Sequence, residues 1–391
     1  MVSSFSFTPP PGIVFGLHTV SRLPDLAAKY GKKALVLTGA GSFVKTPRWA
    51  EFLQKMEDRG VAVLHEVIAE EPTPELVDFC VSRFRYEAPD VVVAIGGGSV
   101  LDAGKAVSAM LAEPGSVFDY LEGVGSKNPS GAKRPFIAVP TTAGTGSEAT
   151  KNAVISRVGK TGFKKSLRHD RYVPDIAIVD PALAVSCSPA QTAYSGMDAF
   201  TQLLESYVST KASPMTDALA LDGLRFVSRS LVKAWKDGYD LQARADMAYA
   251  ALLSGITLAN AGLGLVHGFA GVIGGWYKIP HGVICGSLMG VVNQAACAKI
   301  PGNSQYGEAQ KKYATVGRLF ADDEGKKGDT YYVALLAEEI ATRVEEMRIP
   351  RLGSYGLTKA DIAEIAAHAD FKNHPVTHTA EELETILRLR L

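Results

Sequence analysis

Four polar side chains in the second half of the sequence have the types and spacing of a metal site. Asp198 and Gln202 are four residues apart in a segment with a helical pattern, so both project from one face of that helix. A carboxylate placed there, beside apolar packing, needs a partner, and a cation supplies one. His267 and His281 each lie next to a glycine in an apolar stretch. Together the four offer a mixed nitrogen and oxygen ligand set for a first-row divalent metal, Fe or Zn.

The chemistry that such an ion would assist is hydride transfer. A bound metal polarises a carbonyl or lowers the pKa of an alcohol. Asp198, His267 and His281 are therefore the candidate catalytic residues. A single histidine in an apolar stretch is more often a core residue held by a hydrogen bond, so the metal hypothesis depends on all these residues meeting.

Two loops in the first half have the composition of phosphate-binding loops. The segment GGGSVLDAGK at 96–105 follows a buried strand and opens a helix, where glycines allow close approach and the helix N-terminus offers N–H groups. The segment PTTAGTGSEAT at 140–150 also follows a strand and holds five hydroxyl residues and two glycines. Parallel strands end at one edge of their sheet, where open α/β sheets bind ligands. A tight turn is the alternative for either loop alone.

The loops require a parallel sheet to position them, and the first half of the sequence predicts one. Its apolar runs lack period-two alternation, which indicates strands buried on both faces, and helical patterns separate them. The expected strands are 33–38, 61–68, 90–95, 135–139 and 175–179, with helices at 47–59 and 74–86. This half is predicted to be a doubly wound, Rossmann-like α/β domain.

After residue 181 the pattern becomes helical. The expected helices are 189–211, 214–236, 241–261, 283–299, 305–320, 330–347, 358–369 and 379–390. A chain of 391 residues exceeds the usual size of one core. We therefore expect two domains, an α/β dinucleotide-binding domain at 1–182 and an all-α metal and substrate domain at 183–391.

The composition of the chain limits the classes of binding partner and of cellular compartment that we expect. The 41 basic and 41 acidic residues balance, which argues against a nucleic acid or an anionic membrane as partner. The four cysteines form no CxxC pair, and the N-terminus lacks the pattern of a signal peptide. No apolar run approaches the roughly 20 residues that span a bilayer. We expect a cytoplasmic protein that forms a homodimer.

These motifs, taken together, carry a family resemblance. The sequence resembles the iron-containing (group III) alcohol dehydrogenases through GGGSVLDAGK, PTTAGTGSEAT, DIAIVDP, GMDAFTQLLESY, LVHGFAGVIGGWYKIPHG and KNHP, in that order. The resemblance implies a dehydroquinate-synthase-like fold, with a Rossmann-like first half, a helical second half and a dinucleotide in the cleft between them. It also implies hydride exchange between NAD(P)(H) and a small alcohol or aldehyde.

The resemblance also implies roles for individual residues. The cofactor would be bound by nine residues that match the family's motifs: Gly97, Gly98, Ser99, Asp102, Thr141, Thr142, Thr145, Asn152 and Lys164. Of the implied metal ligands, Asp198, His267 and His281 match the family pattern.

The chain departs from the family at two positions. Gln202 stands where the family has a ligand histidine, and Gly271 stands where it has a further histidine. An amide oxygen can ligate a metal, but it is a weaker donor than imidazole. The preferred hypothesis is a weakly held metal. The alternatives are a metal-free NAD(P)H-dependent reductase of the maleylacetate reductase type, and a cofactor-binding protein without dehydrogenase turnover.

The residues after the expected strand at 33–38, interpreted as the second Rossmann-type strand, bear on the choice of nicotinamide cofactor. An NAD-preferring site places a carboxylate near this point to accept the ribose hydroxyls. Here Gly39 leaves room for a 2′-phosphate, which Ser42 and Lys45 could bind. The sequence therefore favours NADP(H), unless Lys45 merely begins a solvated helix.

Overall fold

The computed structural model describes residues 4–41, 43–322 and 326–391. The chain divides into two compact units, each described here by itself. The α/β unit comprises Thr8–Arg157 and Lys164–Cys187, and the helical unit comprises Ser188–Leu391 with Val158–Phe163 and the described part of Met1–Phe7. The change from one unit to the other falls at Cys187/Ser188 in this division, and the single boundary after residue 182 stays a prediction.

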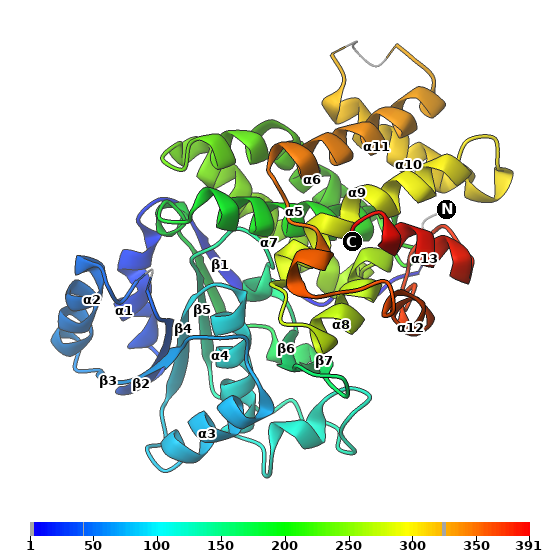
Figure 1. Ribbon diagram of the computed structural model, residues 1–391. Coiled ribbons are helices and arrows are strands. Elements are labelled where there is room, and N and C mark those ends of the chain that lie inside the picture. The colour runs from blue at the N-terminus through cyan, green and yellow to red at the C-terminus, as the bar shows by residue number, and fades with distance from the viewer. Residues whose placement is uncertain (1–3, 42, 323–325) are drawn as a thin grey trace. The chain divides into compact units, whose positions relative to one another are not determined.

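A six-stranded parallel sheet forms the centre of the α/β unit (Figure 1). Its order is β1-β8-β5-β4-β2-β3, with every neighbouring pair parallel. The strands are β1 (Gly12–Phe15), β2 (Lys33–Gly39), β3 (Ala62–Ile68), β4 (Val91–Gly96), β5 (Phe136–Pro140) and β8 (Ile176–Val179). The predicted parallel α/β fold is confirmed.

Helices cover both faces of this sheet. They are α1 (Leu23–Ala27), α2 (Pro47–Asp58), α3 (Pro74–Phe84) and α4 (Gly98–Met110). Side chains of α1 and α2 share one buried cluster with alternate residues of the strands, such as Val91 and Val93. On the other face α4 packs closely, since a Cβ at Gly104 would lie 2.6 Å from that of Ala94. The strands are consequently apolar on both sides, which is why the sequence shows no alternation.

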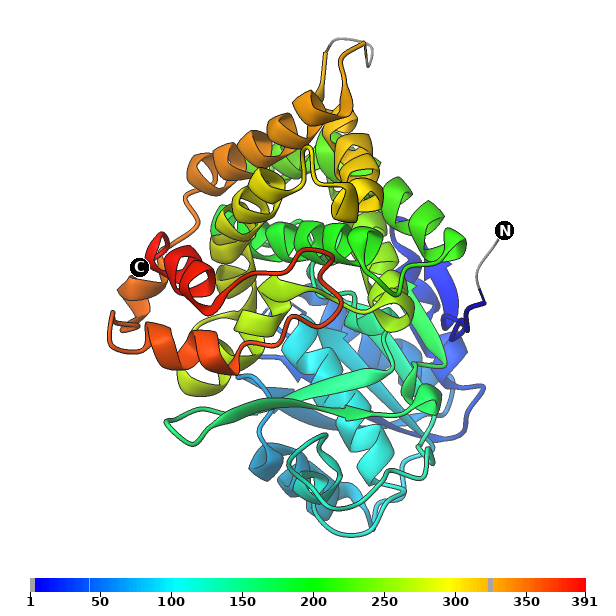
Figure 2. The same cartoon turned by 90° about the vertical axis from the view of Figure 1, so that its right-hand side faces the viewer.

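Three strands of the α/β unit lack the apolar pattern of the others. β1 is a short edge strand with an exposed pattern, and β6 (Asn152–Arg157) pairs with β7 (Phe163–Arg168) in a separate two-stranded sheet. Figure 2 shows this hairpin as a ribbon apart from the main sheet. Its strands are polar and only partly buried, so hydrophobicity gives no signal for them.

The helical unit contains nine α-helices among the described residues. They are α5 (Pro189–Val208), α6 (Pro214–Lys236), α7 (Leu241–Ala261), α8 (Leu265–Trp276), α9 (His281–Lys299), α10 (Gly307–Gly317), α11 (Asp329–Glu346), α12 (Ile362–His368) and α13 (Ala380–Arg388). Several begin with a cap that the sequence encodes: Ser188, Ser213 and Asp240 each accept a backbone N–H in the first turn. The predicted all-α second half is confirmed.

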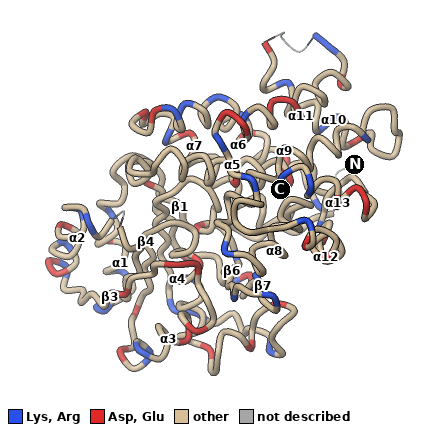
Figure 3. Tube along the Cα trace, in the orientation of Figure 1, with Lys and Arg blue, Asp and Glu red and all other residues tan. Residues whose placement is uncertain are grey.

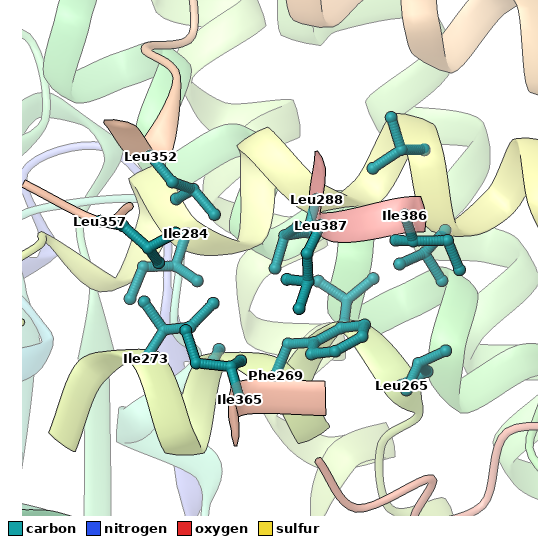
Figure 4. Close-up of a cluster of buried hydrophobic side chains, with 14 of the residues drawn as sticks. Leu265, Phe269, Ile273, Ile284, Leu288, Leu352, Leu357, Ile365, Ile386 and Leu387 are labelled. Carbon is teal, nitrogen blue, oxygen red and sulfur yellow. The ribbon is translucent and has the colours of Figure 1, made fainter. Parts of the chain in front are cut away.

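The sequence did not predict α8. Its 12 residues include Gly268, Gly271, Gly274 and Gly275, and glycine is the poorest helix former after proline. Tertiary packing stabilises the helix instead. Leu265, Phe269 and Ile273 lie on one face and enter a buried cluster with α9, α12 and α13 (Figure 4). This packing fixes the rotation of α8 about its axis and so decides where His267 projects.

No single helix in the described part of the chain has the length and hydropathy of a membrane span. One bent pair, α7 with α8 at 96°, passes that test on length and composition together. Figure 3 shows basic and acidic residues interspersed along the helices of both units.

Candidate active site

Three helices of the helical unit bring the predicted metal residues together. On α5, Asp198 and Glu205 are seven residues apart and therefore share one face. On α8, His267 projects from the side opposite the apolar face, and on α9 His281 is the first residue, directly after Pro280. Helix periodicity sets the face from which each side chain projects, and the packing of the helices brings these faces together.

The donor atoms of this cluster lie at ligand-to-ligand distances. His267 Nε2 is 3.4 Å and His281 Nε2 is 3.7 Å from Asp198 Oδ1. Cys285, one helical turn after His281, places its Sγ 3.6 Å from each of these two nitrogens. One donor atom each from Asp198, His267, His281 and Cys285 all lie within 4.8 Å of one another. The predicted meeting of Asp198, His267 and His281 is therefore found.

Electrostatics favour an anionic Asp198 in this buried place. Burial acts to raise its pKa, but the imidazoles of His281 and His267 outweigh that effect and hold the pKa below its ordinary value. Asp198 Oδ1 is buried and accepts no hydrogen bond from any described residue. A buried carboxylate oxygen that faces two imidazole nitrogens and accepts from neither fits a divalent cation, which would satisfy all three.

Glu205 orients His267. Its Oε2 lies 2.7 Å from His267 Nδ1, and its Oε1 accepts the backbone N–H of Val266 at 2.7 Å. Because the carboxylate accepts, Nδ1 carries the proton and the lone pair of Nε2 faces the cluster. Burial raises the pKa of Glu205, but His267 outweighs it and lowers that pKa. Glu205 was not predicted from the sequence, although its spacing of seven residues from Asp198 was a usable signal.

Gln202 lies beside the cluster, and its amide is already engaged. Its Nε2 donates to Asp198 Oδ2 at 3.2 Å, and its Oε1 accepts from Ser254 Oγ at 3.0 Å. The alternative amide orientation would place an oxygen against the carboxylate, which is repulsive. Gln202 thus holds Asp198 so that its other oxygen faces the histidines, and ligation by Gln202 stays a prediction.

The two glycine- and threonine-rich loops of the α/β unit lie side by side. β4 and β5 are neighbours with Gly96 opposite Pro140, and Thr141 N donates to Gly96 O at 2.9 Å. Gly97 is the N-cap of α4, and a Cβ at Gly98 would lie 2.7 Å from Thr145 Cγ2. Glycine at 98 therefore allows the second loop to approach the start of α4.

Other predicted cofactor residues line the same loops. Ser99 follows Gly98 in the first turn of α4, and Thr142 lies 3.5 Å from the place of a Cβ at Gly97. Asp102 accepts from Ser147 Oγ at 2.5 Å and from Val154 N at 3.1 Å, so it ties the two loops together. Burial raises the pKa of Asp102.

The remaining predicted cofactor residues lie on other elements. Asn152 begins β6 and donates to Ser166, while Lys164 on β7 pairs with Glu71 at 2.6 Å. Gly39 ends β2 beside Val100, Lys45 is exposed before α2, and Ser42 lies outside the described residues. The structure gives the positions of these residues but not their contacts with a cofactor. Their roles in cofactor binding therefore stay predictions.

Lys105 is a buried cation that the sequence analysis did not single out. Its Nζ donates to Ser147 O, Thr150 Oγ1 and Asn152 O, each at 2.8 Å, and Asp102 lies 4.0 Å away. Burial lowers the pKa of Lys105 to about 8. This lysine links α4 to the second loop and to β6, so it stabilises the shape of the whole loop region.

The α/β unit has a glycine-rich strand-to-helix loop and the helical unit has a carboxylate–histidine cluster, the parts that a nucleotide-dependent oxidoreductase requires. Family comparison makes this specific. Residues 10–181 match the family model described as iron-containing alcohol dehydrogenase, and residues 192–390 match its C-terminal family. The chain belongs to the iron-containing alcohol dehydrogenase family, and the enzyme class predicted from the sequence is confirmed.

Individual relatives agree with this assignment. Alcohol dehydrogenase 4 of Saccharomyces cerevisiae (strain YJM789) is 34% identical over 99% of both chains. An NAD-dependent methanol dehydrogenase of Bacillus methanolicus is 37% identical over 72% of this chain and 73% of its own. An NADPH-dependent butanol dehydrogenase of Clostridium saccharobutylicum is 35% identical over 71% and 70%. The crystal structure of a 1,3-propanediol oxidoreductase superposes with a TM-score of 0.88, 30% identity and full coverage of both chains.

Proposed function

We propose that this alcohol dehydrogenase interconverts small alcohols and aldehydes with NADP(H), assisted by a divalent metal ion in the helical unit. The observation that carries the metal is Asp198 Oδ1, which is buried, accepts no hydrogen bond among the described residues, and faces His267 and His281. When bound, the metal supplies Lewis-acid polarisation of the substrate oxygen.

The chain's own residues have separable tasks in this proposal. Gln202 and Glu205 orient Asp198 and His267 through hydrogen bonds, so the donor atoms are preorganised before the ion binds. The backbone N–H groups at the start of α4, together with the loop that Asp102 and Lys105 hold against it, bind the pyrophosphate of the dinucleotide. Neither the residues around the metal site nor those of the pyrophosphate-binding loops transfer a proton in these roles.

The preference for NADP(H) rests on the end of β2. Gly39 presents no carboxylate to the adenine ribose, and a Cβ there would reach only Val100 at 3.7 Å, so the place is roomy. Lys45 is exposed, and its ammonium can reach solvent-facing phosphate. A relative named for NADPH lies as close in sequence as one named for NAD, so the residues, not the relatives, carry this preference.

Isothermal titration of NADPH and NADH into the protein tests the preference. We expect tighter binding of NADPH, and Lys45→Ala should weaken NADPH by about tenfold while leaving NADH unchanged, as for one lost charge-assisted hydrogen bond. Lys29→Ala is a matched control, because Lys29 is exposed and precedes the opposite end of β2. Equal affinity for both cofactors, or an unchanged ratio in Lys45→Ala, contradicts the proposal.

The metal-free reductase is the second candidate, favoured by the loss of two family histidines at Gln202 and Gly271. Elemental analysis followed by chelation separates the two candidates. Turnover that survives exhaustive chelation, in protein that holds no metal, selects the metal-free reductase.

We also propose a cytoplasmic homodimer. Cys80, Cys285 and Cys297 are buried thiols outside any disulfide, as a reducing compartment would keep them. The edge strand β1 exposes apolar side chains that a second copy would cover, as Ile13 is 42% exposed.

A further inference from the structure

Cys285 is the one member of the cluster that neither the sequence pattern nor the family's ligand set supplies. It lies on α9 four residues after His281, so both side chains project from the same helix face. Its side chain is buried, and its Sγ is equidistant from His267 Nε2 and His281 Nε2, at 3.6 Å. A thiol whose sulfur is equally close to two metal-type imidazole nitrogens has the position of a ligand.

The distances among the donors match a tetrahedral zinc site. With Zn–N near 2.05 Å and Zn–S near 2.3 Å, a tetrahedral angle separates N from S by roughly 3.6 Å and N from O by roughly 3.4 Å. The observed N···S separations are 3.6 Å, and the N···O separations are 3.4 and 3.7 Å. These four separations agree with four donors on three helices that share one such ion, and all four donor atoms lie within 4.8 Å of one another.

Gln202 is poorly arranged for the same task. Its amide nitrogen donates to Asp198, and its oxygen accepts from Ser254 on α7, which lies outside the cluster. Ligation by Gln202 through its oxygen would turn the amide and remove the hydrogen bond that Asp198 Oδ2 accepts from Gln202 Nε2. The sulfur of Cys285 requires no such rearrangement.

We propose that Cys285 is the fourth protein ligand of the metal, in place of the family histidine that Gln202 replaces. The ligand set is then Asp198, His267, His281 and Cys285, with two anionic donors instead of one. Metal binding displaces the thiol proton of Cys285 to solvent and forms the metal–sulfur bond. A thiolate shifts selectivity towards softer, thiophilic ions, so this chain should prefer Zn²⁺ or Co²⁺ over Fe²⁺. The inference builds on the proposed metal-assisted reaction, but its test involves no turnover.

The absorption spectrum of the cobalt-substituted protein tests directly whether Cys285 is a ligand. Protein stripped with a chelator and titrated with Co²⁺ should show the visible bands of a low-symmetry four-coordinate ion and an intense near-ultraviolet band from thiolate-to-cobalt charge transfer. Cys285→Ser should lose the near-ultraviolet band and bind Co²⁺ at least about tenfold more weakly. Gln202→Ala should keep the band, because the amide is not a ligand.

Cys297→Ser is the matched control, since Cys297 is also a buried thiol on α9 but lies outside the cluster. It should bind Co²⁺ with the wild-type spectrum. X-ray absorption of the zinc-loaded wild-type protein needs no variant and should show one sulfur near 2.3 Å among lighter neighbours near 2.0–2.1 Å.

Some outcomes overturn the proposal outright. Co²⁺ bound without a charge-transfer band, a band that survives in Cys285→Ser, or no sulfur in the zinc absorption data would each do so. Failure to bind any divalent ion would also overturn it. A protein that shows the sulfur signature yet reduces no aldehyde would keep Cys285 as a ligand and refute the proposed function instead.

Discussion

At the scale of single residues, a few charged groups of this chain are buried, and those near the loop at 140–150 act together. Lys105 and Glu148, the latter in the loop at 140–150 itself, are almost inaccessible to solvent, and the partly buried Asp102 lies beside Lys105. Lys105 donates hydrogen bonds to Ser147 and Thr150 of the loop, and Asp102 accepts one from Ser147. Burial raises the pKa of Glu148 to about 7, with Lys105 opposing that change.

Glu148 therefore makes stability depend on pH. A folded-state pKa near 7, above the ordinary 4.5, means that the folded protein holds this proton more tightly than the unfolded chain does. The resulting stability is present below pH 4.5 and is lost as the pH rises through 7. Glu148→Gln lacks this ionisation, so its stability relative to wild type should increase from pH 5 to pH 8, by roughly 3 kcal/mol at most.

Calorimetric melting temperatures at pH 5 and pH 8 measure this difference. The gain should be on the order of 5 °C in this chain. Glu57→Gln, a change of the same kind at an exposed position of α2, should show no such trend. A pH-independent difference for Glu148→Gln would show that the buried carboxyl stays protonated throughout or is stabilised in both forms.

Only some residues of the candidate site could be predicted from the sequence. Asp198, His267 and His281 were predictable because each type is a metal ligand and the resemblance marks each position. Cys285 and Glu205 were not selected, although each follows a predicted ligand by whole helical turns. A thiol and a carboxylate in an apolar helix have many structural roles, and only the packing of α5, α8 and α9 shows which atoms meet.

At the scale of elements, the buried parallel strands and the capped helices were predictable, whereas α8 and the β6–β7 hairpin were not. Strands such as β4 are apolar over their whole length, and such a run predicts a buried strand without knowledge of its neighbours. Helix α8 forms against its glycine content because Leu265, Phe269 and Ile273 are buried by α9, α12 and α13. The helix propensity of the residues in α8 does not include this stabilisation, because it comes from helices that are distant in the sequence.

Two glycines of α8 should respond in opposite ways to the same substitution. A Cβ at Gly271 meets nothing within 4 Å, whereas a Cβ at Gly268 would lie 1.8 Å from the backbone oxygen of Asp370. Gly271→Ala should stabilise the protein by about 0.5–1 kcal/mol through helix propensity. Gly268→Ala should cost about 1–3 kcal/mol or more, because the backbone at Asp370 must move.

Thermal melting of the two variants provides the comparison, each serving as the control for the other. Loss of stability in Gly271→Ala would mean that the open space beside His267 is filled in the working protein. An unaffected Gly268→Ala would mean that the segment at 370 is free to shift.

At the scale of the whole molecule, the two edges of the sheet differ in what they offer a second copy. β1 and β3 are the edge strands. On β1, Val14 packs into the core while Ile13 and Phe15 face outward, 42% and 39% exposed, and Leu17 follows at 44%. On β3, Val67 is 40% exposed between the polar Glu66 and the buried Ile68. An edge strand that exposes a row of apolar side chains is stabilised by pairing with another strand.

We expect the protein to form a dimer through β1, and Ile13→Lys to weaken it. A lysine on an edge strand opposes strand pairing by charge and by the cost of burying an ammonium, so the dimer dissociation constant should rise at least about tenfold. Sedimentation equilibrium at micromolar concentration measures the mass against the 41.6 kDa of one chain. Val67→Lys places the same charge at a similarly exposed valine on the other edge and should leave the dimer intact. A monomeric wild type would refute the dimer itself, while equal weakening by both substitutions would show that β1 is not the contact and that added charge alone separates the subunits.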